Sequence, residues 1–120
     1  MTTNKINHKD MVATLVKPGK QIRESLTAED CHLIHMAIGV AGEAGELIDA
    51  VKKHTIYRTP LDLENVIEEL GDLEFYMEGL RQGLSLSREQ ILDANIQKLS
   101  KRYEGLKYSD KAAKDRKDKQ

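Results

Sequence analysis

The stretch that decides the fold of this chain is GVAGEAGELIDAVKK, residues 39–53. Its apolar side chains recur every three or four residues, at Val40, Ala44, Leu47, Ile48 and Val51. This period predicts an amphipathic helix with one apolar face. The stretch also holds glycines at positions 39, 42 and 45, and each costs a helix about 1 kcal/mol relative to alanine. A helix that keeps them is expected to have a packing partner or a ligand close to its backbone.

Outward from this stretch, the helix is predicted to extend from its N-cap, Thr27, to about His54. Glu29 and Asp30 follow the cap and place negative charge in the first turn, where it opposes the helix dipole. The connection after the helix contains Pro60, which cannot continue it.

A second long helix is predicted over residues 63–82, with Asp62 as its cap and a glycine directly after it. Its apolar positions are Val66, Leu70, Leu73, Met77 and Leu80. Ser87, with Gln90 three residues on, matches a capping box and predicts a third helix that ends before Gly105. The side chains of this helix that we expect to point inward are Leu92, Ile96, Leu99 and Tyr103.

The chain has no strand-like alternation and no internal repeat, and its two prolines are too few for a turn-rich β fold. We therefore predict an all-α fold, a helical bundle of about four to five helices. Three segments are expected: an N-terminal lead-in (residues 1–26), a helical domain (27–106) and a basic tail (107–120). In the lead-in, Pro18 should interrupt an amphipathic segment over residues 11–16.

Composition excludes several classes of protein. With 120 residues, 39% of them apolar and 32% charged, the chain has the size and balance of one soluble domain. The lone cysteine, Cys31, excludes a disulfide framework or a cysteine zinc site within one chain. No apolar run has the length of a membrane span, and the first ten residues are too polar for a signal peptide. A cytoplasmic location with no membrane partner is expected.

Charge is distributed unevenly along the chain. The tail holds six basic and three acidic residues, so it carries +3, whereas the rest carries −4 of a formal net charge of −1. Such a tail can bind nucleic acid or attract an anionic ligand. We prefer the interpretation that it is a solvated, frayed end, and no specific nucleic-acid partner is expected.

Four apolar residues lie off the main stripes of the first two long helices. They are Ile34, Ile38, Ile67 and Phe75. A second apolar face on helices that are few for a monomer predicts that the chain forms an oligomer.

Two pairs of carboxylates carry the chemistry. Glu43 and Glu46 are three residues apart on the first long helix, and Glu69 and Asp72 have the same spacing on the second. Residues three apart are neighbours on one helix face, so antiparallel packing brings both pairs to a common border. Four carboxylates repel one another unless protons, cationic side chains or a divalent metal ion neutralise them. Oxygen ligands favour Mg²⁺, Mn²⁺ or Ca²⁺ over zinc.

The third helix supplies the opposite charge. Asn95, Lys98 and Arg102 lie on one line of it, beside its apolar stripe. A row of amide, ammonium and guanidinium groups near a metal site suits a polyphosphate. Lys53, on the same strip as the first acidic pair, is a weaker candidate for the same role.

Three motifs in this order are similar to those of the MazG-like members of the all-α nucleoside triphosphate pyrophosphohydrolase superfamily. They are GEAGEL (residues 42–47), EELGD (68–72) and NIQKLSKRY (95–103). The resemblance covers about residues 32–104. It implies a short, single-domain protein of phage or bacterial type whose protomers form a homodimer or a dimer of dimers.

The resemblance also assigns roles to residues of the 27–106 catalytic domain. It makes Glu43, Glu46, Glu69 and Asp72 the ligands of Mg²⁺, for which Mn²⁺ can substitute. It directs Asn95, Lys98 and Arg102, with Lys53, at the phosphates. The implied reaction is hydrolysis of a nucleoside triphosphate to the monophosphate and pyrophosphate, in cleansing of the nucleotide pool or in phage-related nucleotide metabolism.

Alternatives stay open on the sequence alone. Within the superfamily, enzymes similar to phosphoribosyl-ATP pyrophosphatase or to dimeric dUTPase use the same carboxylate arrangement. A non-catalytic helical module that binds a partner in an acidic groove is the alternative of another class. His35 and Tyr76 align with the carboxylates, but packing is the role we expect of both.

Overall fold

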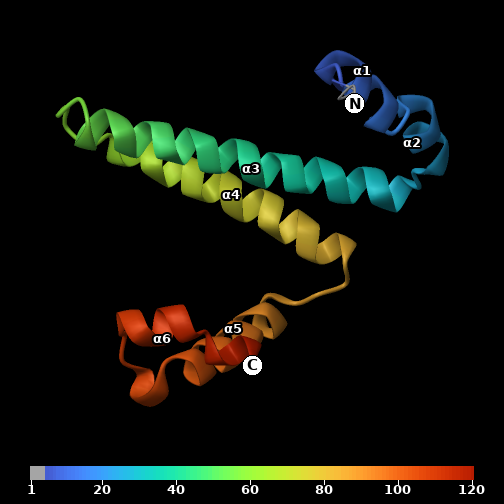
Figure 1. The fold of residues 1–120 in the computed structure, drawn as a ribbon. Helices are drawn as coiled ribbons and strands as arrows, with labels where there is room; N and C mark the ends of the chain where they lie inside the picture. Colours follow the sequence, from blue (N-terminus) through green and yellow to red (C-terminus); the bar gives the residue numbers. More distant parts are fainter. Residues whose placement is uncertain (1–4) are drawn as a thin grey trace. The chain divides into compact units, whose positions relative to one another are not determined.

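The computed structural model describes residues 5–120. Those residues form six α-helices, two short 3₁₀ turns and no strand, which confirms the all-α class (Figure 1). The elements are α1 (His8–Leu15), α2 (Gly19–Ser25), α3 (Ala28–Thr55), α4 (Leu63–Gly83), α5 (Arg88–Arg102), η1 (Glu104–Leu106), α6 (Asp110–Asp115) and η2 (Lys117–Lys119). The count exceeds the expected four to five because the tail contributes α6. In the described part of the chain, no helix has the length and apolarity that crossing a bilayer requires.

The chain divides into two units, residues 1–31 and 32–120. In the first unit, α1 ends at Leu15 and α2 begins at Gly19, so the predicted interruption at Pro18 is confirmed. Asn7 caps α1 by accepting a hydrogen bond from the Asp10 N–H. The first four residues of the predicted lead-in lie outside the described residues.

Each of the three long helices begins where its predicted cap places it. The Thr27 hydroxyl accepts from the Asp30 N–H at 3.1 Å, and the Thr27 N–H donates to the Asp30 carboxylate at 3.0 Å. These bonds to Thr27 hold the pKa of Asp30 below its ordinary value. Asp62 accepts from the N–H of Asn65, and Ser87 forms the complete capping box of α5. Local capping thus fixes the helix starts that the sequence predicted.

In the second unit, α3 and α4 form an antiparallel hairpin (Figure 1). A methyl group at Gly83 would lie 2.6 Å from the His32 ring, and one at Gly39 would overlap the ring of Tyr76. Met36 fills the space above Gly79 in the same way. Each step of three or four residues along α3 is matched by the same step back along α4. Large side chains on one helix therefore pack onto glycines of the other, and this pattern sets the register.

Close contacts at the glycines adjoin the predicted apolar stripes. We expected these stripes to meet, and most of their residues are half-buried; a methyl group at Gly83 would also lie 3.2 Å from the side chain of Leu33, a stripe residue. Only two apolar side chains of the described residues are buried, Met36 and Ala50. The predicted stripe residues Leu33, Leu47 and Leu73 are half-buried. Without a β-carbon, Gly39 and Gly79 let Tyr76 and Met36 pack closely beside these stripes.

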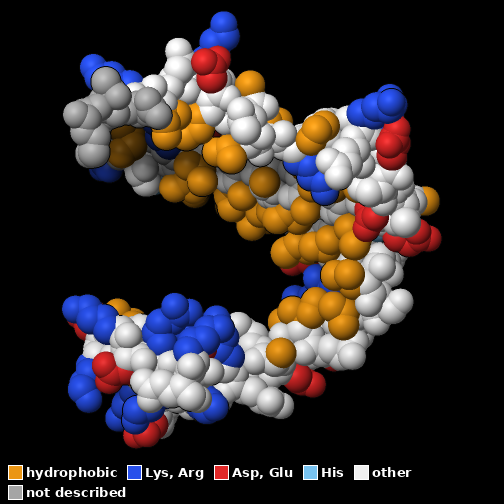
Figure 2. Space-filling view, turned by 45° about the vertical axis from the view of Figure 1, so that its right-hand side comes forward, with side chains coloured by type: hydrophobic (Ala, Val, Ile, Leu, Met, Phe, Trp, Pro, Cys, Tyr) orange, Lys and Arg blue, Asp and Glu red, His pale blue; other side chains and the backbone are white. Residues whose placement is uncertain are grey.

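Apolar side chains remain exposed on all three long helices. The four residues that lay off the predicted stripes are exposed as expected, with 68% of Phe75 accessible. Of the third-helix residues expected to point inward, Tyr103 is half-buried, whereas Leu92, Ile96 and Leu99 are exposed, with 61% of Ile96 accessible. Figure 2 shows hydrophobic side chains in broad areas of the viewed surface. The inward prediction is therefore wrong for Leu92, Ile96 and Leu99 in the single chain.

The basic tail is folded, which corrects the expectation of a frayed end. The Ser109 hydroxyl caps α6 by accepting from the N–H of Ala112. Arg116 adopts a left-handed conformation, φ 48°, that ends α6 and turns the chain into η2. Contacts of α6 and η2 with α5 hold the segment in place. Composition did not reveal this, because Asp118 and Lys117 of the tail form ion pairs with Arg102 and Glu104, which lie outside it.

Candidate metal centre

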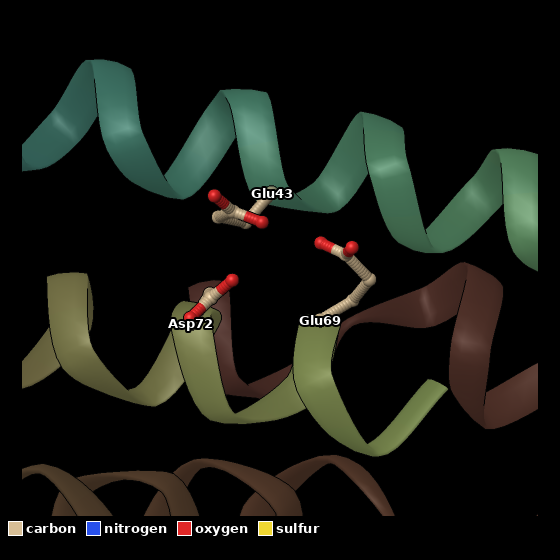
Figure 3. A group of neighbouring side chains, drawn as sticks. All are labelled: Glu43, Glu69 and Asp72. Carbon is tan, nitrogen blue, oxygen red and sulfur yellow. The ribbon is translucent and has the colours of Figure 1, made fainter. Parts of the chain in front are cut away.

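The register of the α3–α4 hairpin places Glu43 opposite Asp72 and Glu46 opposite Glu69. One carboxylate oxygen from each of Glu43, Glu69 and Asp72 lies within 4.8 Å of the other two. Figure 3 shows the three carboxylates pointing toward one another between the two helices. Three of the four predicted metal ligands therefore meet in the structure of a single chain.

The proximity of these groups changes the protonation of Glu69. A hydrogen bond with Glu43 is the main cause that raises the pKa of Glu69 to about 7, and burial adds to it. The negative charges of Glu43, Glu46 and Asp72 raise this pKa further. Two carboxyl groups can share a hydrogen bond only if one of them holds a proton. Near neutral pH this pair can therefore either keep its proton or lose it and bind a cation.

The donor set fits a hard divalent cation. The Oε2 atom of Glu69 is buried and has no hydrogen-bond partner in the described chain, which is an unfavourable state for a carboxylate oxygen. All three converging groups are carboxylates, the ligands that Mg²⁺ and Mn²⁺ prefer. A cation between them would satisfy the buried oxygen and remove the repulsion.

Glu46 lies at the edge of this group. It is exposed and its oxygens are not among the three that converge, yet its charge contributes to the raised pKa of Glu69. Its position one turn from Glu43 keeps it within reach of a bound ion or its water. The assignment of Glu46 as a ligand stays a prediction.

The contact between Gly39 and Tyr76 lies one helical turn from the pair Glu43 and Asp72. The Tyr76 ring packs where a β-carbon of Gly39 would be, and His35 meets the ring edge-on at 6.2 Å between centroids. Tyr76 is half-buried, in line with the packing role expected of it. This contact sets the separation of the two helices beside the carboxylates.

Not every costly glycine of α3 has a contact within the chain. Gly42 and Gly45 have nothing within 4 Å of the position that a β-carbon would take, and neither does Gly71 of α4. The expectation of a close partner is therefore met at Gly39 alone. The sequence did not identify Gly79 and Gly83 as contacts, because their role depends on the pairing of the helices.

Lys53 pairs within its own helix. Its ammonium group lies 3.0 Å from the Asp49 carboxylate, one turn away, and both side chains are exposed. The hydrogen bond to Asp49 and its charge raise the pKa of Lys53, with smaller contributions from Glu46 and Asp62. Lys53 is thus charged and lies in the field of Glu46, without contact to the three clustered carboxylates.

The predicted phosphate contacts lie on α5, and the structure does not bring them to the carboxylates. Asn95 and Lys98 are exposed. Arg102 is bound to Asp118 of the tail, with 2.7 Å between Nε and Oδ1. The elements that α5 touches include η1, α6 and η2. The role of Asn95, Lys98 and Arg102 at the phosphates stays a prediction.

Comparison with known proteins adds a family. No match was found among curated proteins or among solved structures. The family model described as the MazG nucleotide pyrophosphohydrolase domain matches residues 33–106, more than half of the chain. This segment contains α3 from Leu33 onward, all of α4 and α5, and the three clustered carboxylates. The chain belongs to the MazG nucleotide pyrophosphohydrolase family.

Proposed function

We propose that the chain is a Mg²⁺-dependent hydrolase that converts a nucleoside triphosphate to the monophosphate and pyrophosphate. The observation that carries this proposal is the convergence of Glu43, Glu69 and Asp72 on one point, with a buried oxygen that lacks a partner. The family match makes a phosphoanhydride the bond to be cleaved.

In this proposal the chain's residues divide the work. Glu43, Glu69 and Asp72 hold the cation, with Glu46 as a fourth ligand. When bound, the divalent cation neutralises phosphate oxygens and lowers the pKa of a coordinated water. Lys98 and Arg102, assisted by Asn95 and Lys53, bind the phosphates and stabilise the charge of the leaving pyrophosphate. The water oxygen forms a bond to one phosphorus of the α–β anhydride, the bond from that phosphorus to the bridging oxygen breaks, and a carboxylate of the site accepts the proton of the water.

The interaction of Glu43 with Glu69 makes binding of a cation dependent on pH. The pKa of Glu69 near 7 means that the pair releases its proton close to neutral pH. A carboxylate pair in this state accepts a cation at the cost of one proton. Cation affinity is therefore expected to increase with pH up to about 7.

We also propose that the functional unit is a homodimer or homotetramer. A single chain leaves the apolar faces of α3, α4 and α5 exposed, including Ile38, Phe75 and Ile96. Exposed apolar areas of this extent are typical of surfaces that bind another protein. Sedimentation equilibrium tests this proposal, and a monomer at micromolar concentration would contradict it.

The decisive experiment is product analysis. The protein is incubated with Mg²⁺ and each ribo- and deoxynucleoside triphosphate, and with phosphoribosyl-ATP, and the products are separated by ion exchange. Monophosphate and pyrophosphate in equal amounts support the proposal, and the preferred substrate identifies the branch of the family. Release of orthophosphate and nucleoside diphosphate would contradict it. No turnover of any substrate would favour the non-catalytic binding module.

A further inference from the structure

The C-terminal segment lies outside the part of the chain that matches the family. The match ends at residue 106, and the segment after it folds as α6 and η2. Both elements contact α5, the helix that carries the predicted phosphate-binding residues. Lys and Arg side chains gather over these C-terminal elements, in the lower part of Figure 2. An addition to the family domain thus touches a functional helix.

One ion pair makes the contact specific. Arg102 donates from Nε to Oδ1 of Asp118 at 2.7 Å and from Nη2 to Oδ2 at 3.2 Å. The Arg102 side chain is 15% exposed and that of Asp118 is 4% exposed. Two parallel hydrogen bonds of this kind are the geometry in which a guanidinium binds a carboxylate or a phosphate. The pKa of Asp118 is held below its ordinary value, mainly by this hydrogen bond with Arg102.

The fold of the C-terminal segment places Asp118 against α5. The left-handed backbone of Arg116, φ 48°, reverses the chain between α6 and η2. Lys117 anchors the turn through its ammonium group, which lies 3.0 Å from the Glu104 carboxylate. The other ion pair of the segment, Lys111 with Asp115, is exposed and does not involve α5. Of these pairs, only that of Asp118 covers a residue expected at the substrate.

We propose that the Asp118 carboxylate competes with the substrate's phosphates for Arg102. By masking Arg102 in this way, the C-terminal segment inhibits the enzyme. This inference rests on the proposed function, because it takes Arg102 as a phosphate contact. A carboxylate and a phosphate oxygen use the same N–H donors, and the two cannot occupy them together. Substrate binds fully only when η2 releases Arg102.

A positioning role for Asp118 makes the opposite prediction. If Asp118 only oriented the guanidinium, its loss would weaken substrate binding and raise KM. If Asp118 competes, its loss lowers KM. Apparent affinity is reduced by the fraction of molecules in the competent state. A segment that masks Arg102 nine-tenths of the time therefore raises KM about tenfold.

The test compares Asp118→Asn with Asp115→Asn in the full chain. Both changes remove one negative charge from the same segment, so a general attraction of the anionic substrate affects them equally. We expect KM for the preferred nucleotide to fall by about three- to tenfold in Asp118→Asn and to stay unchanged in Asp115→Asn. In an Arg102→Ala background, Asp118→Asn should have no further effect on KM.

Binding of inorganic tripolyphosphate, measured by calorimetry on the same variants, separates this inference from the proposed function. If no nucleotide is hydrolysed, the proposed function fails, while tighter tripolyphosphate binding in Asp118→Asn alone still supports masking. Equal or weaker binding in Asp118→Asn overturns masking. So does an equal gain in Asp115→Asn, or a gain that persists without Arg102.

Discussion

The α3–α4 hairpin and the C-terminal region treat charge in opposite ways. In the hairpin, Glu43, Glu69 and Asp72 converge, and none of them takes part in an ion pair within the described part of the chain. In the C-terminal region, the buried Asp118 carboxylate is bound by Arg102 through two hydrogen bonds. Carboxylates held together are stabilised by a proton or a cation, whereas the carboxylate of an ion pair is already neutralised. This difference favours the hairpin over the tail as the place for the proposed metal ion.

The largest expected effect tests the hairpin directly. Replacing Asp72 by Ala removes one of three converging carboxylates and should lower turnover by about 10³-fold or more, since the cation supplies several kcal/mol of transition-state stabilisation. Glu68→Ala is the control, because Glu68 is a neighbouring, exposed carboxylate outside the cluster. Initial rates with saturating Mg²⁺ measure both. Equal loss in the two variants would mean that general charge, and not the cluster, matters.

A second test concerns the contact that spaces the two helices. Gly39→Ala places a methyl group in the Tyr76 ring and should destabilise the chain by about 1–3 kcal/mol, as overpacking does. Gly42→Ala is its matched control, because it meets no atom within 4 Å and should stabilise by up to about 1 kcal/mol. Urea unfolding without metal measures both. Opposite signs confirm that Gly39 is needed for packing, and the same sign in both would refute it.

The shared proton predicts a pH dependence of stability. The pKa of Glu69 is about 7 in the folded chain and 4.5 as an ordinary glutamate, so the folded state binds more protons between these values. The stability from this proton is fully present below pH 4.5 and is lost as pH rises through about 7. Melting temperatures without metal should fall over that window, and Mg²⁺ should restore most of the loss at pH 8.

Glu69→Gln is the variant that isolates this effect, since an amide keeps a donor for Glu43 without a titrating proton. Its melting temperature should be nearly independent of pH over the same window. A slope equal to that of the unmodified chain would assign the titration to another group. Glu68→Gln should keep the full slope.

The smallest expected effect concerns the start of α5, the helix that the C-terminal segment contacts. Ser87→Ala removes the hydroxyl that accepts the Gln90 N–H and should cost about 1 kcal/mol. Ser100→Ala, within the same helix and exposed, should change stability by less than half as much. Urea unfolding followed by circular dichroism measures the difference. Equal effects would show that the capping box of α5 contributes nothing of its own.

The features that local sequence determined are those set within one turn of helix. The caps at Thr27, Asp62 and Ser87 each depend on a residue three positions away, so the sequence predicted where α3, α4 and α5 begin. The two acidic pairs depend on the same spacing, which put their members on one face of each helix. The family motifs added the chemistry that spacing alone left open.

Tertiary structure decided what depends on residues far apart in the chain. Helical periodicity predicted the apolar faces of α3 and α4, whereas the packing of Tyr76 on Gly39 and of Met36 on Gly79 fixed the register between the two helices. The raised pKa of Glu69 exists only in that register, because it needs Glu43 from the other helix. The pairing of Arg102 with Asp118 joins residues 16 positions apart, across the reversal at Arg116. A periodic pattern cannot predict such contacts, because it shows which face of a helix is apolar but not which residues of another element pack against that face.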